Sequence, residues 1–155
     1  MKKYELTEET VTVYGKTLYR IRAVRDFGSV KTGEFGGYIE KEENLSHFGD
    51  AWVYGNAKVY GNARVSGNAW VYGNAEVFNT RHFFVQGPIG SRDGYVTFYR
   101  TKDDTIGVRC GCFSGSLQKF VDRVEETHGG SRYEKEYKIA AELAKVCIRL
   151  EGESR

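Results

Sequence analysis

Residues 49–78 read GDAWVY GNAKVY GNARVS GNAWVY GNAEVF, which are five consecutive copies of one six-residue unit. Within each unit Ala and Val are separated by one residue, so both side chains lie on the same face of a strand. Gly and Asn tolerate a left-handed backbone and turn the chain at a corner. We therefore expect each unit to form one short strand and one corner. Three units would complete a coil of 18 residues around a narrow interior of Ala and Val.

Two weaker units precede these copies, at residues 37–42 and 43–48, and place Ile39 and Leu45 in the alanine column. The pattern resembles the hexapeptide-repeat family, which includes acyltransferases and related carbonic anhydrases. This resemblance implies a short left-handed parallel β-helix over residues 37–79. It also implies a homotrimer, because proteins of that family usually associate side by side in threes.

The 18-residue period predicts which outward side chains stack in neighbouring coils, about 4.8 Å apart. The expected pairs are Trp52 over Trp70, Tyr54 over Tyr72, Lys58 over Glu76 and Tyr60 over Phe78. The first two pairs form a face too apolar to remain in water. Another subunit, the C-terminal segment or a ligand can cover it. The resemblance favours a subunit, so we predict a homotrimer or hexamer with Trp52, Tyr54, Trp70 and Tyr72 at the interface.

The flanking segments predict two further parts. Residues 11–24 form two candidate strands around Gly15-Lys16, which predicts a β-hairpin. We expect residues 1–36 to cap the open end of the coil, since an unpaired strand edge recruits other chains.

Residues 80–155 predict a small α+β module. Strands are expected over 82–86, 95–100 and 105–110, with a loop over 87–94. A helix capped by Ser114 or Ser116 would run through Glu126, and a capping box from Ser131 to Glu134 would open a second helix. The predicted fold is thus mixed α/β: a hairpin cap, a short left-handed parallel β-helix of hexapeptide repeats, and an α+β module with two helices.

Composition narrows the functional classes. The formal net charge of +2 is too small to predict a long nucleic acid or a membrane as partner. No apolar stretch approaches the roughly 20 residues that span a bilayer, and the N-terminus does not resemble a secretory leader. We expect a cytoplasmic protein without a cofactor. The odd number of cysteines, three, argues against a disulfide scaffold.

Three phrases extend the resemblance over most of the chain. They are GGYIEKEENLS at 36–46, GPIGSRDGYVTFYR at 87–100 and RCGCFSGSLQKF at 109–120. They resemble uncharacterised small proteins of bacteriophages and prophages. The resemblance implies the cytoplasm of a host cell as the location, and it brings no established chemistry.

The histidines do not form a recognisable catalytic set. In hexapeptide acyltransferases a histidine is the general base. Here no repeat carries the loop insertion that usually supplies this histidine. His47 occupies the repeat position of Val53, and we expect it to be the last core residue at the end of the coil. His47, His82 and His128 also lack the repeat-related spacing of a carbonic anhydrase. We assign no catalytic residue and keep an acyltransferase-like enzyme as an alternative.

A zinc site at Cys110, Cys112 and His128 is conceivable but is not predicted. Cys-x-Cys spacing is tighter than usual, and no fourth ligand is evident. The simpler interpretation is two small buried thiols on one face of a strand.

A ligand site is predicted in the α+β module. Glycines in the loop 87–94 expose backbone N–H groups beside an arginine, and residues 111–116 precede a helix N-terminus, both of which suit an anion. Nearby aromatic rings can stack on a base. The predicted site comprises Ser91, Arg92, Tyr99, Arg100, Arg109, Phe113, Ser114 and Lys119. The alternative is an ordinary hairpin loop followed by a capped helix.

The functional hypothesis is a non-enzymatic phage-type protein that binds and sequesters a small anionic ligand. A nucleotide or cyclic nucleotide that signals in host immunity is the expected ligand, which would make the protein an anti-defence sponge. An acyltransferase-like enzyme and a structural or assembly protein are the alternatives.

Overall fold

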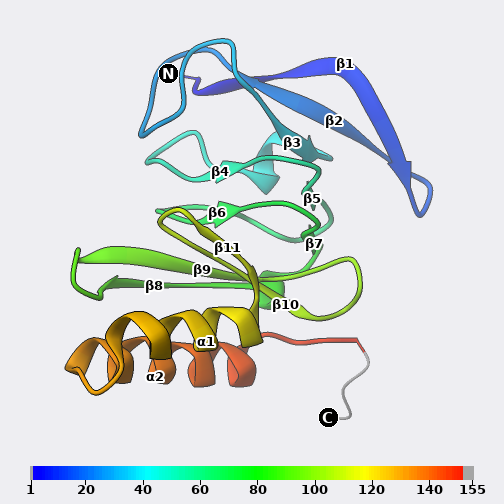
Figure 1. Ribbon diagram of the computed structural model, residues 1–155. Helices are drawn as coiled ribbons and strands as arrows, with labels where there is room; N and C mark the ends of the chain where they lie inside the picture. Colours follow the sequence, from blue (N-terminus) through cyan, green and yellow to red (C-terminus); the bar gives the residue numbers. More distant parts are fainter. Residues whose placement is uncertain (1, 152–155) are drawn as a thin grey trace. The chain divides into compact units, whose positions relative to one another are not determined.

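The computed structural model describes residues 2–151, which divide into two compact units with the boundary between Thr80 and Arg81 (Figure 1). The described chain is mixed α/β, with several sheets and two helices. The strands of the first unit are β1 (Tyr4–Val13), β2 (Lys16–Ala23), β3 (Phe35–Ile39), β4 (Trp52–Val53), β5 (Lys58–Val59), β6 (Trp70–Val71) and β7 (Glu76–Val77). The second unit contains β8 (Phe83–Ile89), β9 (Gly94–Arg100), β10 (Ile106–Cys110), β11 (Phe113–Ser116), α1 (Leu117–His128) and α2 (Arg132–Cys147).

The predicted N-terminal hairpin is present as β1 and β2, which pair antiparallel from Tyr4↔Ala23 to Val13↔Lys16. Its turn lies one residue earlier than predicted, at Tyr14 and Gly15, whose φ values are 49° and 77°. Two central residues with positive φ match the twist of the flanking strands. β2 also pairs with β3, so the hairpin extends a five-stranded sheet in the order β1-β2-β3-β5-β7. β2 thus covers the edge of β3 that does not pair with β5.

The repeats build the interior that their pattern predicts. The alanine and valine columns are between 0% and 2% exposed, and they comprise Ala51, Ala57, Ala63, Ala69, Ala75, Val53, Val59, Val65, Val71 and Val77. The corner glycines at 55, 61, 67 and 73 have φ between 62° and 70°. The parallel rungs Trp52↔Trp70 and Lys58↔Glu76 confirm the 18-residue stacking.

The two weaker units are placed differently from the prediction. Ile39 pairs with Val59 and Leu45 with Val65, both at a separation of 20 residues. Both side chains therefore belong to the valine column and not to the alanine column. The pattern missed this shift because a 3₁₀ turn at Glu42–Asn44 interrupts the strand-and-corner alternation.

The prediction of a left-handed parallel β-helix is wrong as a description of the fold. The pairing of the longer strands is antiparallel, and the strands lie in several sheets that do not form a β-helical solenoid. The repeat strands β4 to β7 are two residues long and pair in parallel only as short rungs. A corner every six residues limits each repeat strand to this length. The antiparallel strands β1 and β2 are therefore the longest strands of the sheet that β5 and β7 join.

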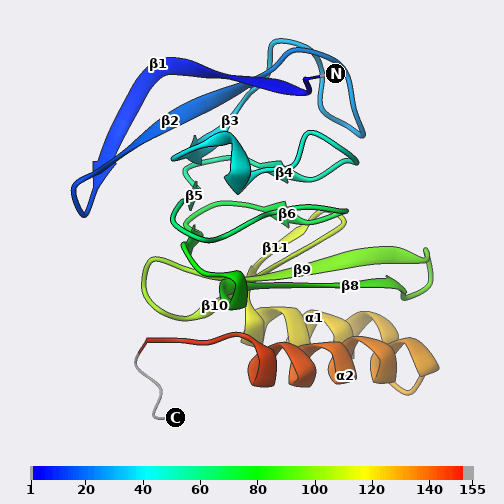
Figure 2. The same cartoon turned by 180° about the vertical axis from the view of Figure 1, so that it is seen from behind.

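The second unit is an antiparallel sheet in the order β11-β10-β9-β8, with both helices on one face (Figures 1 and 2). Its core lies between sheet and helices and is built by Val96, Phe98, Val108, Phe120, Val124, Ala140, Ala141, Ala144 and Ile148. β8 runs through part of the predicted loop, and β11 is a strand that the sequence analysis missed.

The helix caps differ in part from the prediction. The Ser116 hydroxyl caps α1 by accepting the N–H of Lys119 at 3.2 Å, which decides between Ser114 and Ser116. At α2 the predicted capping box does not form. The Ser131 hydroxyl donates to the His128 carbonyl, and the Glu134 carboxylate accepts the N–H of Gly130. The chain thus enters α2 through a turn that is tied back to α1.

Candidate binding pocket

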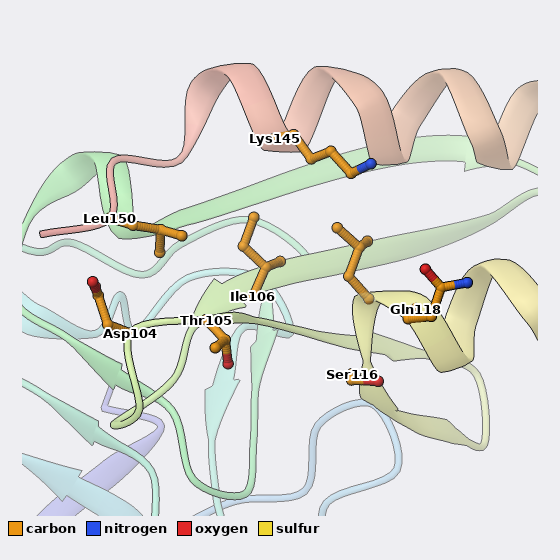
Figure 3. A pocket seen from close by; sticks show the side chains of 8 residues that line it. Asp104, Thr105, Ile106, Ser116, Gln118, Lys145 and Leu150 are labelled. Carbon is orange, nitrogen blue, oxygen red and sulfur yellow. The ribbon is translucent and has the colours of Figure 1, made fainter. Parts of the chain in front are cut away.

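A hollow of about 500 Å³ opens in the second unit where the β9–β10 turn, the start of α1 and the end of α2 come together (Figure 3). Its lining comprises Asp104, Thr105, Ile106, Ser116, Leu117, Gln118, Lys145 and Leu150. Three of these side chains are aliphatic and the rest are polar or charged. The hollow therefore offers an apolar surface with a polar rim, which is the usual composition of a small-molecule site.

Two features place positive charge at the rim of the hollow, which also carries the Asp104 carboxylate. Lys145 extends from α2 over the hollow toward the side where Gln118 stands (Figure 3). The capped N-terminus of α1 forms the opposite wall, and such a terminus carries about half a positive charge. Lys145 also pairs with Glu142 at 3.1 Å, but Glu142 does not line the hollow.

The one carboxylate on the rim is already engaged. Asp104 Oδ1 accepts the Nε–H of Arg100 and the N–H of Glu151, both at 2.9 Å. The side chain of Arg100 is 6% exposed, and its guanidinium also lies 3.4 Å from the Glu151 carboxylate. These bonds fix the β9–β10 turn and engage the Asp104 carboxylate, with the Arg100 guanidinium shared between Asp104 and Glu151.

In the loop that was predicted to bind an anion, the backbone N–H of Gly90 already has a partner in the protein. The N–H of Gly90 donates to the Glu136 carboxylate of α2 at 2.7 Å. Ser91 and Arg92 are exposed on the same loop. A backbone donor that the prediction assigned to a phosphate thus holds the loop on the helix.

The other predicted ligand residues do not converge on one place. The ring of Tyr99 covers Gly107 on the sheet, and the guanidinium of Arg100 belongs to the Asp104 ion pair. Arg109 and Ser114 are cross-strand neighbours. Phe113 packs against Phe120, at 5.8 Å between ring centroids, and Lys119 is exposed on α1.

None of these predicted residues lines the hollow. The residues that do line it come from distant parts of the sequence, and only Ser116 carried a signal, as a helix cap. Lys145, Gln118 and Leu150 had no local pattern that distinguished them from ordinary surface residues.

The aromatic face of the repeats is partly covered by the chain itself. Trp52 is 1% exposed and packs edge-on against Phe27 at 5.1 Å, so it cannot serve as a subunit contact. Tyr54 packs against Trp70 and Tyr72, at 5.2 Å and 4.4 Å, and these three rings remain half-buried. The segment before the repeats thus covers Trp52 through Phe27.

Each histidine is held in a structural setting. His47 stacks on Tyr4 at 4.1 Å, its Nδ1 accepts the Lys3 N–H, and its Nε2 lies 2.8 Å from Glu42. Burial, followed by the charge of Arg100, lowers the pKa of His82 to about 4. The ring of His128 lies 5.6 Å from that of Tyr137.

Two of the cysteines, Cys110 and Cys112, lie at the β10–β11 turn, and Cys110 is hydrogen-bonded to Tyr137. Cys110 pairs with Phe113 across the β10–β11 turn, which contains Gly111 and the exposed Cys112. Burial raises the pKa of the Cys110 thiol, while a hydrogen bond with Tyr137 opposes this shift. Among residues 2–151, no three His, Cys, Asp or Glu side chains are grouped so that they could hold a metal ion. Neither helix in that range is long and apolar enough to cross a membrane.

A comparison with protein-family models found no family that matches this chain, and a comparison with curated proteins found no match either.

Proposed function

We propose that this protein is a non-enzymatic binding protein for a small organic anion, and that the hollow beside α1 is its binding site. The observation that carries the proposal is the combination of an aliphatic surface with Lys145 and the α1 N-terminus on one rim. An anionic group would lie between these two positive features. The rest of the ligand would contact Ile106, Leu117 and Leu150.

The chemistry of the lining favours an aliphatic anion, such as a short-chain carboxylate or a phosphate monoester. No aromatic side chain lines the hollow, so stacking on a nucleobase gains no support there. A nucleotide remains a ligand class to test, because the hypothesis of a phage-type nucleotide sponge arose from the sequence resemblance. A non-enzymatic protein releases its ligand unchanged. The lining fits this role, because its only carboxylate, that of Asp104, accepts hydrogen bonds from Arg100 and from the backbone N–H of Glu151.

The test is a titration followed by two-dimensional ¹H–¹⁵N NMR of the full chain. The panel holds short-chain carboxylates, phosphate monoesters, mononucleotides and cyclic dinucleotides. We expect at least one class to bind in fast or intermediate exchange and to shift the amide signals of Thr105, Leu117 and Gln118. A charge-assisted contact contributes about 1.5–3 kcal/mol, so Lys145→Met should weaken binding by about 10- to 100-fold.

Lys119→Met is the matched control. Lys119 lies on the same turn of α1 as the lining residues Leu117 and Gln118 but does not line the hollow. It is also one of the ligand residues predicted from the sequence. The proposal fails if no ligand of the panel binds more tightly than about 1 mM. It also fails if Lys119→Met abolishes binding while Lys145→Met leaves it intact, because the ligand would then lie elsewhere.

A further inference from the structure

The polar side chains on the rim of the hollow offer a ligand two kinds of partner. The ammonium of Lys145 donates one hydrogen bond to Glu142 at 3.1 Å and keeps its other N–H groups. The Ser116 oxygen accepts the N–H of Lys119, so its own O–H stays a donor. Gln118 differs from both, because its amide carries an acceptor oxygen as well as donor N–H groups. The orientation of this amide therefore decides what the hollow can accept from a ligand.

Asp122 fixes the orientation of the Gln118 amide. It lies one helical turn later on α1, and its Oδ1 accepts a hydrogen bond from Nε2 of Gln118 at 2.9 Å. An ionised carboxylate accepts hydrogen bonds and donates none, so the amide nitrogen must face Asp122 and the oxygen must face away from it. Figure 3 shows the nitrogen directed along α1 and the oxygen directed toward α2, on the side of Lys145. Within residues 2–151 no group donates a hydrogen bond to this oxygen.

We infer that the ligand is a hydroxylated aliphatic anion whose hydroxyl group is selected by Gln118, an inference that rests on the proposed function because it concerns the same hollow. The anionic group would accept hydrogen bonds from Lys145 and from the Ser116 hydroxyl. The hydroxyl group of the ligand would donate to Oε1 of Gln118. The hydrocarbon chain would contact Ile106 and Leu117. A short hydroxy acid is the simplest molecule that meets all three requirements.

The charges on the rim favour a hydroxyl group over an ammonium group as the donor to Gln118. An ammonium group at Gln118 would lie next to the positive end of α1, on the side toward which Lys145 extends, and both would repel it. Asp104, the only carboxylate of the lining, stands on the opposite side of the hollow and accepts a hydrogen bond from Arg100 (Figure 3). A hydroxyl group donates without adding positive charge. The hollow therefore suits a hydroxylated anion better than its amino-substituted analogue.

NMR titrations of the full chain with matched ligands test this specificity. One set holds hexanoate, its derivatives with a hydroxyl group on the second or third carbon, and the corresponding amino acids. A second set holds butyl phosphate and its hydroxybutyl analogues. Because one neutral hydrogen bond contributes a modest net free energy, a hydroxylated ligand should bind about 3- to 10-fold more tightly than its parent in at least one set. The amino acids should bind more weakly than hexanoate.

Three variants on α1 assign the preference to the Gln118 oxygen. Gln118→Met keeps the length of an exposed side chain and removes the acceptor, so the hydroxylated ligand should fall to the affinity of its parent, whose own binding should not change. Asp122→Ala releases the amide, which can then turn its nitrogen toward the hollow, so the preference should fall to about twofold or less. Glu126→Ala removes the same charge from the same helix and should keep the full preference.

The failure of this specificity differs from the failure of the proposed function. Equal binding of parent and hydroxylated ligands in both sets overturns the inference, but the proposed function stands if Lys145→Met still weakens binding. A preference that survives in Gln118→Met, or tighter binding of an amino acid, also overturns the inference. A preference that survives in Asp122→Ala overturns the role of Asp122 in orienting the amide. If no ligand of either set binds more tightly than about 1 mM, the proposed function fails, and the specificity fails with it.

Discussion

Lys3 is a buried cation at the edge of the repeat region, and its replacement should change how stability depends on pH. Its side chain is 0% exposed, and its ammonium donates to the carbonyl of Ala51 at 2.5 Å and lies 4.7 Å from the centre of the Phe27 ring. Along the repeats, the carbonyls of Ala69 and Ala75 accept backbone N–H groups. At Ala51 the ammonium of Lys3 takes the place of the backbone N–H donor.

The cost of this arrangement follows from the pKa. Burial, and then the charge of Arg25, lowers the pKa of Lys3 from 10.5 to about 8. Between these values the unfolded chain binds more protons than the native protein, so the free energy of unfolding rises with pH. With about 1.4 kcal/mol per pKa unit, the native protein should gain about 2 kcal/mol between pH 7 and pH 9.5.

The variant Lys3→Met should lack this gain. We would measure urea unfolding at pH 7 and pH 9.5 by tryptophan fluorescence, because both tryptophans lie in the first unit. The difference in unfolding free energy between wild type and Lys3→Met should shift by about 2 kcal/mol in favour of the wild type at the higher pH. Taking the difference removes the contribution of other groups, such as Tyr4, whose pKa burial raises.

Lys2→Met is the control, because the neighbouring Lys2 side chain is 68% exposed and lies 3.6 Å from Glu42. Its difference from wild type should be the same at both pH values within about 0.5 kcal/mol. If the Lys3→Met difference were equally constant, the ammonium would be hydrated in the native protein, and the reasoning from burial would be refuted.

Three further changes test other parts of the molecule. Asn44→Leu should lower the unfolding free energy, measured in urea, by about 3 kcal/mol. The buried Asn44 amide donates to the Ala63 and Gly61 carbonyls and accepts the Lys41 N–H, and an effect below about 1 kcal/mol would contradict these bonds. Gly90→Ala should cost about 2–4 kcal/mol, since φ is +82° and a methyl group would overlap the Tyr137 hydroxyl. Gly94→Ala should be nearly neutral, because its added methyl group would meet no atom within 4 Å, and equal effects of the two substitutions would contradict the packing at Gly90. The pKa of buried His82 is lowered from 6.5 to about 4, so between these values the unfolded chain binds a proton that the native protein does not. The second unit should therefore lose stability from pH 7 to pH 4, and His82→Gln should lose less in thermal melts.

Local patterns predicted several features of the fold correctly. The repeat columns, the left-handed corners and the 18-residue rungs depend on residues close in sequence, so a six-residue period was sufficient to predict them. A helix start at Ser114 or Ser116 followed from capping in the same way, and the structure selects Ser116. These features are dictated by backbone geometry within one or two turns of chain.

The candidate site was not predictable in this manner. Arg92, Arg100 and Arg109 resembled phosphate ligands by residue type, but Arg100 is engaged by Asp104, and the Gly90 N–H beside Arg92 is engaged by Glu136. Whether a polar group is available for a ligand depends on the partners that the fold brings to it. Sequence spacing carries no information on partners such as Glu136, which lies 46 residues from Gly90.

The repeat sequence alone determined where the small interior residues lie and which side chains stack, because six-residue periodicity acts through local strand and corner geometry. Only the tertiary structure decided the sheet to which the repeat strands belong, since β3 joins them to an antiparallel hairpin. It also decided that Phe27 covers Trp52 and that Lys145 meets the α1 N-terminus at one hollow. These outcomes depend on long-range packing, in which segments distant in sequence compete to cover the same surface.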